Sequence, residues 1–179
     1  FKGRINDTSN PFQKVREEMF HIKFEERFKV KDYRYSIHGM PSLYLGHSLF
    51  CCWMELGQPS LDDLYFSLFV ISDIDFIDLT FSYNHSITNI AYSVLGNESQ
   101  LDIQYQRLVD DFLLWPLIAA CSIFCESKEA SFKQEYIIPQ LLYHLCIEHT
   151  DFRGIRYYST KSMNCQMRMR SYMVNYALP

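Results

Sequence analysis

Residues 34–56 read RYSIHGMPSLYLGHSLFCCWMEL, and this stretch combines three local signals. Gly39 and Pro41 predict a turn, which leads into a short strand over residues 42–46. Ser48 is a residue type that caps helices, so a helix is expected directly after it. Four residues of that helix recur at helical spacing and are expected to face the core: Leu49, Cys52, Trp53 and Leu56. The stretch therefore predicts a compact turn, strand and helix.

Three side chains in this stretch have complementary chemistry. Arg34 precedes the turn, Tyr44 lies on the strand and Glu55 lies on the helix, so a compact unit can bring them to one cleft. A guanidinium suits phosphate, an aromatic face suits a flat heterocycle, and a carboxylate suits a developing cation. The alternative is a surface arginine, a core tyrosine and a solvated glutamate, and the residue types alone do not decide between the two.

The rest of the chain predicts a mixed α+β domain. Residues 20–24 alternate as in a strand or an extended arm, and residues 84–111 fit a connecting helix and loop. We expect a helix over 136–147, because Pro139 falls in its first turn, where proline is tolerated. Further strands are expected at 64–70 and 76–79, taken as a pair, and at 154–159. Strands and helices do not alternate strictly, which favours α+β over α/β.

Composition excludes several classes of protein. The 179 residues are 48% hydrophobic and 21% charged, as in a single globular domain. The formal net charge is −4 and no long basic run occurs, which argues against direct nucleic-acid binding. The apolar run 112–124 contains Pro116 and is too short to cross a bilayer, so we interpret it as a buried element and expect no membrane association. No apolar leader opens the chain.

The six cysteines are interpreted as reduced thiols of a cytoplasmic protein, because four of them lie inside apolar segments. They are Cys51, Cys52, Cys121, Cys125, Cys146 and Cys165. Spacing near His144 leaves a zinc site open, but no CxxC pair supports it and no metal is assigned. Glycine-rich nucleotide motifs are also absent, as are HExxH and GxSxG, so metalloprotease and acyl-transfer chemistry have no support.

The segment 34–46, with Cys52-Trp53-Met54-Glu55 after it, resembles the RES domain family, which is named for its Arg, Glu and Ser. Residues 136–140 and 154–159 resemble a late helix and strand of one branch of the family. The resemblance implies a single RES-like domain over 1–179, built as a small relative of the ADP-ribosyltransferase fold. It also implies a further C-terminal strand beyond this sequence.

The resemblance implies a bacterial toxin that degrades NAD⁺ at the nicotinamide–ribose bond by hydrolysis or phosphorolysis. Glu55 would stabilise the oxocarbenium-like ribose and Tyr44 would stack on the nicotinamide. Arg34 and Arg4 would grip the diphosphate, although Lys2 competes with Arg4 for that position and lacks the bidentate geometry of arginine. Ser131 is implied as a further contact to the ligand. Gln140 lies on one face of the late helix and is a candidate either to contact the ligand or to pack in the core.

The same resemblance implies NAD⁺ as substrate, with no other cofactor, and an antitoxin protein as partner. A homodimer is left open. Two other functions stay open as well. One is ADP-ribosyl transfer to a macromolecule, and the other is an inactive member of the fold that binds NAD⁺ or another protein.

Overall fold

The computed structural model describes residues 1–6, 19–37, 39–80, 98–125, 130, 132–149, 151–161 and 171–179. Within them lies a four-stranded sheet with the strand order β2-β6-β5-β4. Its strands are β2 (Leu43–Gly46), β4 (Ile77–Asp78), β5 (Ile155–Tyr158) and β6 (Val174–Leu178). β6 is antiparallel to both neighbours, whereas β4 and β5 are parallel. A second, antiparallel pair joins β1 (Lys2–Ile5) to β3 (Leu64–Ser67).

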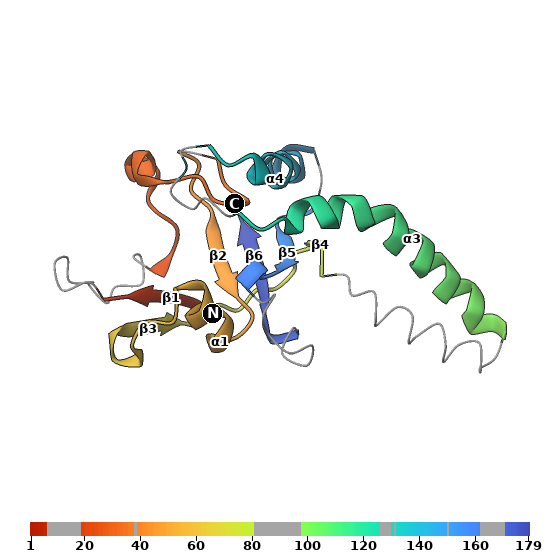
Figure 1. Ribbon diagram of the computed structural model, residues 1–179, viewed down its shortest axis with the longest axis horizontal. Coiled ribbons are helices and arrows are strands. Elements are labelled where there is room, and N and C mark those ends of the chain that lie inside the picture. Colours follow the sequence, from red (N-terminus) through yellow and green to blue (C-terminus); the bar gives the residue numbers. More distant parts are fainter. Residues whose placement is uncertain are drawn as a thin grey trace.

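The described helices are α1 (Leu49–Glu55), α3 (Glu98–Ser122) and α4 (Ile137–His149), with short 3₁₀ helices at Phe24–Lys29, Leu61–Asp63 and Gln134–Tyr136. In Figure 1, α1 lies beside the β1/β3 pair, α4 lies above the larger sheet, and α3 runs outward from it. No helix in the described part of the chain is long and apolar enough to span a bilayer. The mixed α+β class predicted from the sequence is confirmed.

Both faces of the larger sheet are packed. On one face, Ile155, Tyr157 and Ala177 meet α3 and α4 in a buried cluster that also holds Tyr35 and Tyr143. On the other face, Leu43, Leu45 and Leu178 form a second cluster with partly buried residues of the 69–76 segment. Alternation along each strand sends neighbouring side chains to opposite faces, which is why adjacent positions 177 and 178 belong to different clusters.

The turn, strand and helix predicted for 34–56 are confirmed. The Ser48 hydroxyl accepts a 3.0 Å hydrogen bond from the Cys51 amide, which is the expected N-cap contact. The predicted core face of α1 is partly wrong, since Leu49 is 46% exposed while Cys51 and Cys52 are both buried. The helix fits into a corner: Cys51 Sγ faces β6 and Cys52 Sγ faces the backbone of Phe1, so two adjacent positions are covered.

Two strands expected to pair with each other do not. β3 pairs with β1, whereas β4 pairs with β5, so the segments at 64–67 and 77–78 belong to different sheets. Of the strand or extended arm expected at 20–24, the strand is absent: residues 20–23 belong to no strand, and Phe24 begins a 3₁₀ helix. Strand pairing depends on long-range partners that periodicity does not encode.

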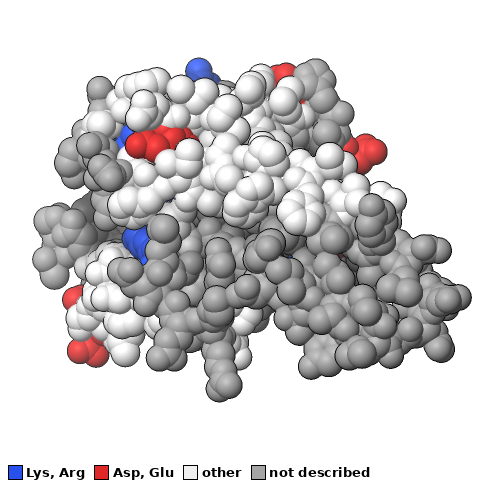
Figure 2. All heavy atoms as spheres, turned by 45° about the vertical axis from the view of Figure 1, so that its right-hand side comes forward, with Lys and Arg blue, Asp and Glu red and all other residues white. Residues whose placement is uncertain are grey.

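Residues 112–122 of the apolar run 112–124 are helical, but much of the run is not buried. They form the second half of α3, which continues through Pro116, and residues 123–124 follow the end of the helix. Phe112, Leu113, Leu114 and Trp115 are all exposed, whereas Ile118 and Cys121 reach the core. Figure 2 shows that most described side chains on the face turned forward are neither acidic nor basic. Only the last turns of α3 therefore act as the buried element that the sequence predicts.

Every cysteine that the structure describes is a free thiol, as predicted, and Cys165 lies outside the described residues.

Residues 174–178 form β6, which lies between β2 and β5 in the interior of the sheet. The segment 84–97 also lies outside the described residues, and 98–111 are part of α3.

Candidate functional site

A cavity of about 690 Å³ lies where the two sheets meet. Its walls come from β1, β2, the end of α1, the segments 20–22 and 31–34, the residues that follow α3 and β5, and Asn175 of β6. The volume falls in the range of sites for small molecules and cofactors. Arg34, Tyr44 and Glu55 all line this cavity, together with Lys2 and Arg4. The structure thus brings together the three side chains on which the sequence hypothesis depends.

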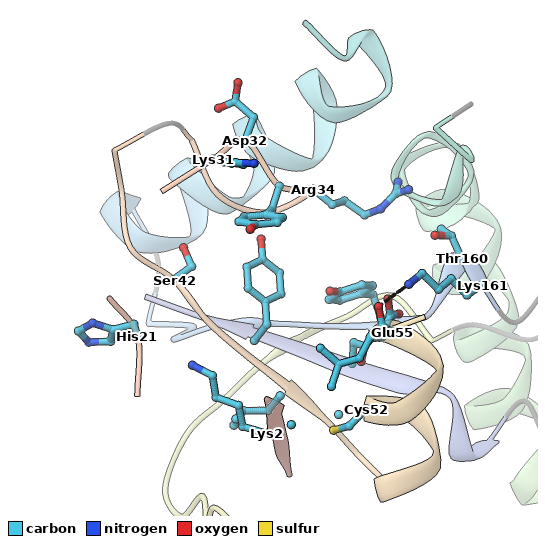
Figure 3. Close-up of a pocket in the computed structure, with 18 of the residues that line it drawn as sticks. Lys2, His21, Lys31, Asp32, Arg34, Ser42, Cys52, Glu55, Thr160 and Lys161 are labelled. Atoms are coloured by element: carbon cyan, nitrogen blue, oxygen red, sulfur yellow. Dashed lines mark hydrogen bonds and ion pairs between the residues drawn. The ribbon is translucent and has the colours of Figure 1, made fainter. Parts of the chain in front are cut away.

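Glu55 is the last residue of α1 and presents its carboxylate to the cavity. One oxygen, Oε1, accepts a 2.7 Å hydrogen bond from the Asn175 side-chain amide. The other, Oε2, lies 3.7 Å from Lys161 Nζ. The Glu55 side chain keeps 35% of its surface exposed, so it is reachable by a ligand. Figure 3 shows Glu55 and Lys161 pointing toward each other at one side of the cavity.

Lys161 is held by the backbone as well as by the carboxylate. Its ammonium donates to the carbonyl oxygen of Met54 at 3.2 Å and to that of Glu55. These carbonyls belong to the last turn of α1, where a cation satisfies unpaired acceptors and opposes the negative end of the helix dipole. The same ammonium therefore caps the end of the helix and lies beside the Glu55 carboxylate.

Asn175 is buried, and its amide is oriented by contacts at both ends. Its Oδ1 accepts from Cys51 Sγ at 3.1 Å, while its Nδ2 donates to Glu55. Burial, with a contribution from the Glu55 charge, raises the pKa of the Cys51 thiol far above its ordinary value. The thiol is therefore a protonated donor, which leaves Nδ2 as the end of the amide that faces Glu55.

Tyr44 on β2 lines the cavity with a ring that is fixed by its hydroxyl. That oxygen accepts a hydrogen bond from the Tyr35 amide at 3.0 Å and donates to Ser36 Oγ at 3.2 Å. The Tyr33 ring packs edge-on against it, with centroids 5.8 Å apart. Burial raises the pKa of the Tyr44 phenol far above its ordinary value, so the group stays neutral. Tyr44 therefore presents a fixed, neutral aromatic ring to the cavity.

The sequence predicts that the Arg34 guanidinium binds the phosphate of a ligand, but in the structure it binds backbone carbonyls. Its guanidinium donates to the carbonyl oxygens of Cys121 and Ile123, both at 2.8 Å, and lies over the Tyr136 ring. Those carbonyls end α3, so the side chain caps that helix, and only 8% of the residue is exposed. Figure 3 shows the Arg34 side chain extending toward α3. Arg34 borders the cavity, but its main contacts are structural.

Lys2 and Arg4 are two residues apart on β1 and both line the cavity, so they share its face. Burial lowers the pKa of Lys2 from its ordinary 10.5 to about 8, and the nearby Arg4 charge adds to this effect. The sequence left open which of these two residues binds the diphosphate, and in the structure both side chains line the same cavity. Both line the space that an anionic ligand would enter.

The cavity is basic, although the chain as a whole is acidic. Its lining carries Lys2, Arg4, Lys31, Arg34, Lys133 and Lys161 against Asp32 and Glu55. The formal net charge of the full sequence is −4. Positive charge concentrated in a concave site attracts anions from solution, so this cavity favours a negatively charged ligand.

Two further residues were predicted to contact a ligand, and one of them, Gln140, is not found at the cavity. The Gln140 amide instead donates to the carbonyls of Tyr33 and Ser36, at 3.1 and 3.2 Å, and fixes the turn that carries Arg34. Ser131 lies outside the described residues. Among the described residues, no group of three or more His, Cys, Asp and Glu side chains is arranged to hold a metal ion.

Sequence reasoning missed Asn175 and Lys161. Asn175 is a polar residue inside the otherwise apolar stretch VNYAL, and a polar residue at a strand position facing a core is a signal of function. Lys161 follows the predicted strand at 154–159 and carried no local signal. Both residues reach Glu55 across more than 100 positions of sequence.

Comparison with known proteins gives one relative. The chain is 36% identical over 180 residues to a protein of Bacillus subtilis (strain 168). That relative is named "Putative toxin YopC". The alignment covers 96% of this chain but 39% of the relative, so the chain spans about two-fifths of its length. No family model matches the chain, and no solved structure matches it. The resemblance to the RES domain family therefore stays a prediction.

Proposed function

We propose that the chain is the catalytic domain of a toxin that degrades NAD⁺ by breaking its nicotinamide–ribose bond. The observation that carries this proposal is the joint placement, in one basic cavity, of the Glu55 carboxylate and the Tyr44 ring. An anionic, partly aromatic ligand with one developing cationic centre fits these three properties together. NAD⁺ has a diphosphate, a flat nicotinamide and a ribose that becomes cationic when the bond breaks.

Nicotinamide does not need to be protonated by the protein before it leaves. Nicotinamide is already cationic in NAD⁺ and leaves as a neutral molecule when it takes the bonding electron pair. The positive charge then develops on the ribose C1′ and its ring oxygen. A carboxylate held close to that charge stabilises the transition state, as in glycosidases. Glu55 supplies the carboxylate. The acceptor is water, which loses a proton to the solvent as its oxygen bonds to C1′, or phosphate, whose oxygen bonds there directly.

The basic residues have two different roles, diphosphate binding and support of α3. Lys2 and Arg4 line the cavity from β1, and Figure 3 shows Lys2 at a distance from Glu55. This separation suits a ligand whose diphosphate and reacting ribose are several bonds apart. Arg34 contributes through its contacts to α3, since its exposed surface is small and two of its N–H groups already bind carbonyls.

The name of the relative supports the toxin part of the proposal. An enzyme that consumes NAD⁺ would harm the cell that makes it, so an inhibitory antitoxin protein is the partner that this function requires. The exposed apolar side chains of α3, from Phe112 to Trp115, supply surface of the kind that proteins bury against one another.

Release of free nicotinamide from NAD⁺ by the purified protein tests the proposal, measured by chromatography with and without phosphate. Glu55→Gln is expected to lower the rate by about 10²–10³-fold, because a neutral amide does not stabilise the cationic ribose. The folded state should persist, since glutamine retains an oxygen that accepts from Asn175. Glu25→Gln is the matched control, because Glu25 is exposed and is not part of the cavity lining.

Two results would contradict the proposal. Wild-type turnover by Glu55→Gln would remove Glu55 from the mechanism. Radiolabel from the ADP-ribose part of NAD⁺ appearing on a protein or nucleic acid would replace degradation by ADP-ribosyl transfer.

A further inference from the structure

The two oxygens of the Glu55 carboxylate are held unequally. Oε1 accepts a 2.7 Å hydrogen bond from Asn175, a length typical of a strong bond to a charged acceptor. Oε2 lies 3.7 Å from Lys161 Nζ, which is an ion pair without a direct hydrogen bond. The carboxylate is therefore anchored through one oxygen and more loosely held at the other.

Asn175 itself has little freedom to move. It is 6% exposed, and its backbone sits in β6, where it lies opposite Gly46 of β2 and Tyr157 of β5. Its Oδ1 is already bound by the Cys51 thiol. A buried amide with contacts at both ends holds its donor in one direction, and here that direction is toward Glu55.

Lys161 cannot replace this anchor. Its ammonium is bound to the carbonyl oxygens of Met54 and Glu55, so its position follows the end of α1. It balances the carboxylate charge but does not fix the orientation of the carboxylate plane. The directional hydrogen bond from Asn175 therefore sets the orientation of the Glu55 carboxylate.

We infer that Asn175 is a positioning residue that fixes Glu55 through Oε1 and leaves Oε2 as the oxygen that meets the ribose of the substrate. This inference rests on the proposed function. Asn175 acts through Glu55 and makes no contact with the reacting atoms. A carboxylate displaced by about 1 Å from its productive position loses about 10²-fold in rate, which sets the expected size of the effect.

Asn175→Leu is the first test, because leucine has a similar size and lacks the donor. We expect kcat for nicotinamide release to fall by about 10²-fold with little change in KM, since the basic residues that bind the diphosphate are untouched. Gln106→Leu is the matched control. Gln106 also donates a side-chain amide to a carboxylate, Asp110 at 3.1 Å, but on the exposed surface of α3.

Asn175→Asp is the second test. Its readout is the pH dependence of nicotinamide release, which a purely structural role of Asn175 would not change. The new carboxyl repels Glu55 when it is ionised, but it can donate a hydrogen bond to Oε1 when it is protonated. The variant should therefore be inactive at neutral pH and recover activity as the pH is lowered. Asn175→Leu should show no such recovery.

The contact itself can be checked without any turnover. In ¹⁵N-labelled protein, the Asn175 side-chain amide signal, assigned by its loss in Asn175→Leu, should shift when Glu55 is replaced by leucine. An unmoved signal overturns the inference. If the wild type is active and Asn175→Leu has the same kcat, the inference is also overturned, but the proposed function is not. Absence of nicotinamide release from the wild type overturns the proposed function and this inference with it.

Discussion

Lys2→Met is expected to make the protein more stable at neutral pH, although it removes a charge from the candidate site. Lys2 lines the cavity next to another cation, Arg4, and within the described part of the chain its ammonium donates a hydrogen bond to the Phe20 carbonyl. Burial and the Arg4 charge oppose its protonation. A methionine fills similar space with no charge to bury.

The size of the effect follows from the pKa. A change from 10.5 to about 8 corresponds to about 3 kcal/mol of unfavourable free energy for keeping Lys2 charged in the folded protein. This is an upper value, because the side chain is partly exposed and methionine also loses the bond to the Phe20 carbonyl. We therefore expect Lys2→Met to raise the free energy of unfolding by about 1–3 kcal/mol at pH 7.

The pH dependence has a definite sign. The folded-state pKa of Lys2 is lower than the unfolded one, so the unfolded chain binds more protons between pH 8 and 10.5. The penalty is complete below about pH 8 and disappears as the pH rises toward 10.5. The stability difference between Lys2→Met and wild type should therefore shrink as the pH rises across this interval.

Urea denaturation at pH 7 and at pH 10 measures both quantities. Lys29→Met is the control, because Lys29 is half exposed and lies outside the cavity lining. Adding inorganic diphosphate at pH 7 should stabilise the wild type more than Lys2→Met, since an anion compensates the buried charge. A variant less stable than the wild type at pH 7, or a stability difference that grows with pH, would refute the reasoning.

Two further predictions concern the frame around the cavity. Arg34→Met should lower the free energy of unfolding by about 2–4 kcal/mol, because two carbonyls at the end of α3 lose charged donors; Arg34→Lys should recover only part of this, and equal denaturation midpoints for Arg34→Met and wild type would contradict the capping role. Gly154→Ala should destabilise by about 1–3 kcal/mol, because the added Cβ would lie 2.7 Å from the Ala177 carbonyl oxygen on the neighbouring strand. A thermal melt of Gly154→Ala that matches the wild type would show that β5 and β6 separate more easily than this contact implies.

Local sequence determined the elements that depend on neighbouring residues. Ser48 caps α1 through a bond to an amide three residues away, and Pro139 falls in the first turn of α4. The strand expected at 154–159 is β5, and the strand expected after the turn at Gly39 and Pro41 is β2. These features are short in range, so the residue types at adjacent positions are sufficient to predict them.

The role of Arg34 shows where local reasoning ends. A guanidinium near a turn is chemically suited to phosphate, and nothing in the neighbouring sequence points to an acceptor at the end of α3. The structure supplies two carbonyl acceptors 87 and 89 residues further along the chain, at the end of α3. The same residue type serves either purpose, and only the position of α3 decides which purpose dominates.

By itself, the sequence determined the mixed class of the fold, the unit at 34–56 and the presence of Arg34, Tyr44 and Glu55 as candidates. Only the tertiary structure decided which strands pair, and it alone brought Asn175 to Glu55 across 120 positions. The reason is that pairing and side-chain contacts at such separations depend on the packing of the whole chain, whereas turns, caps and short strands depend on immediate neighbours.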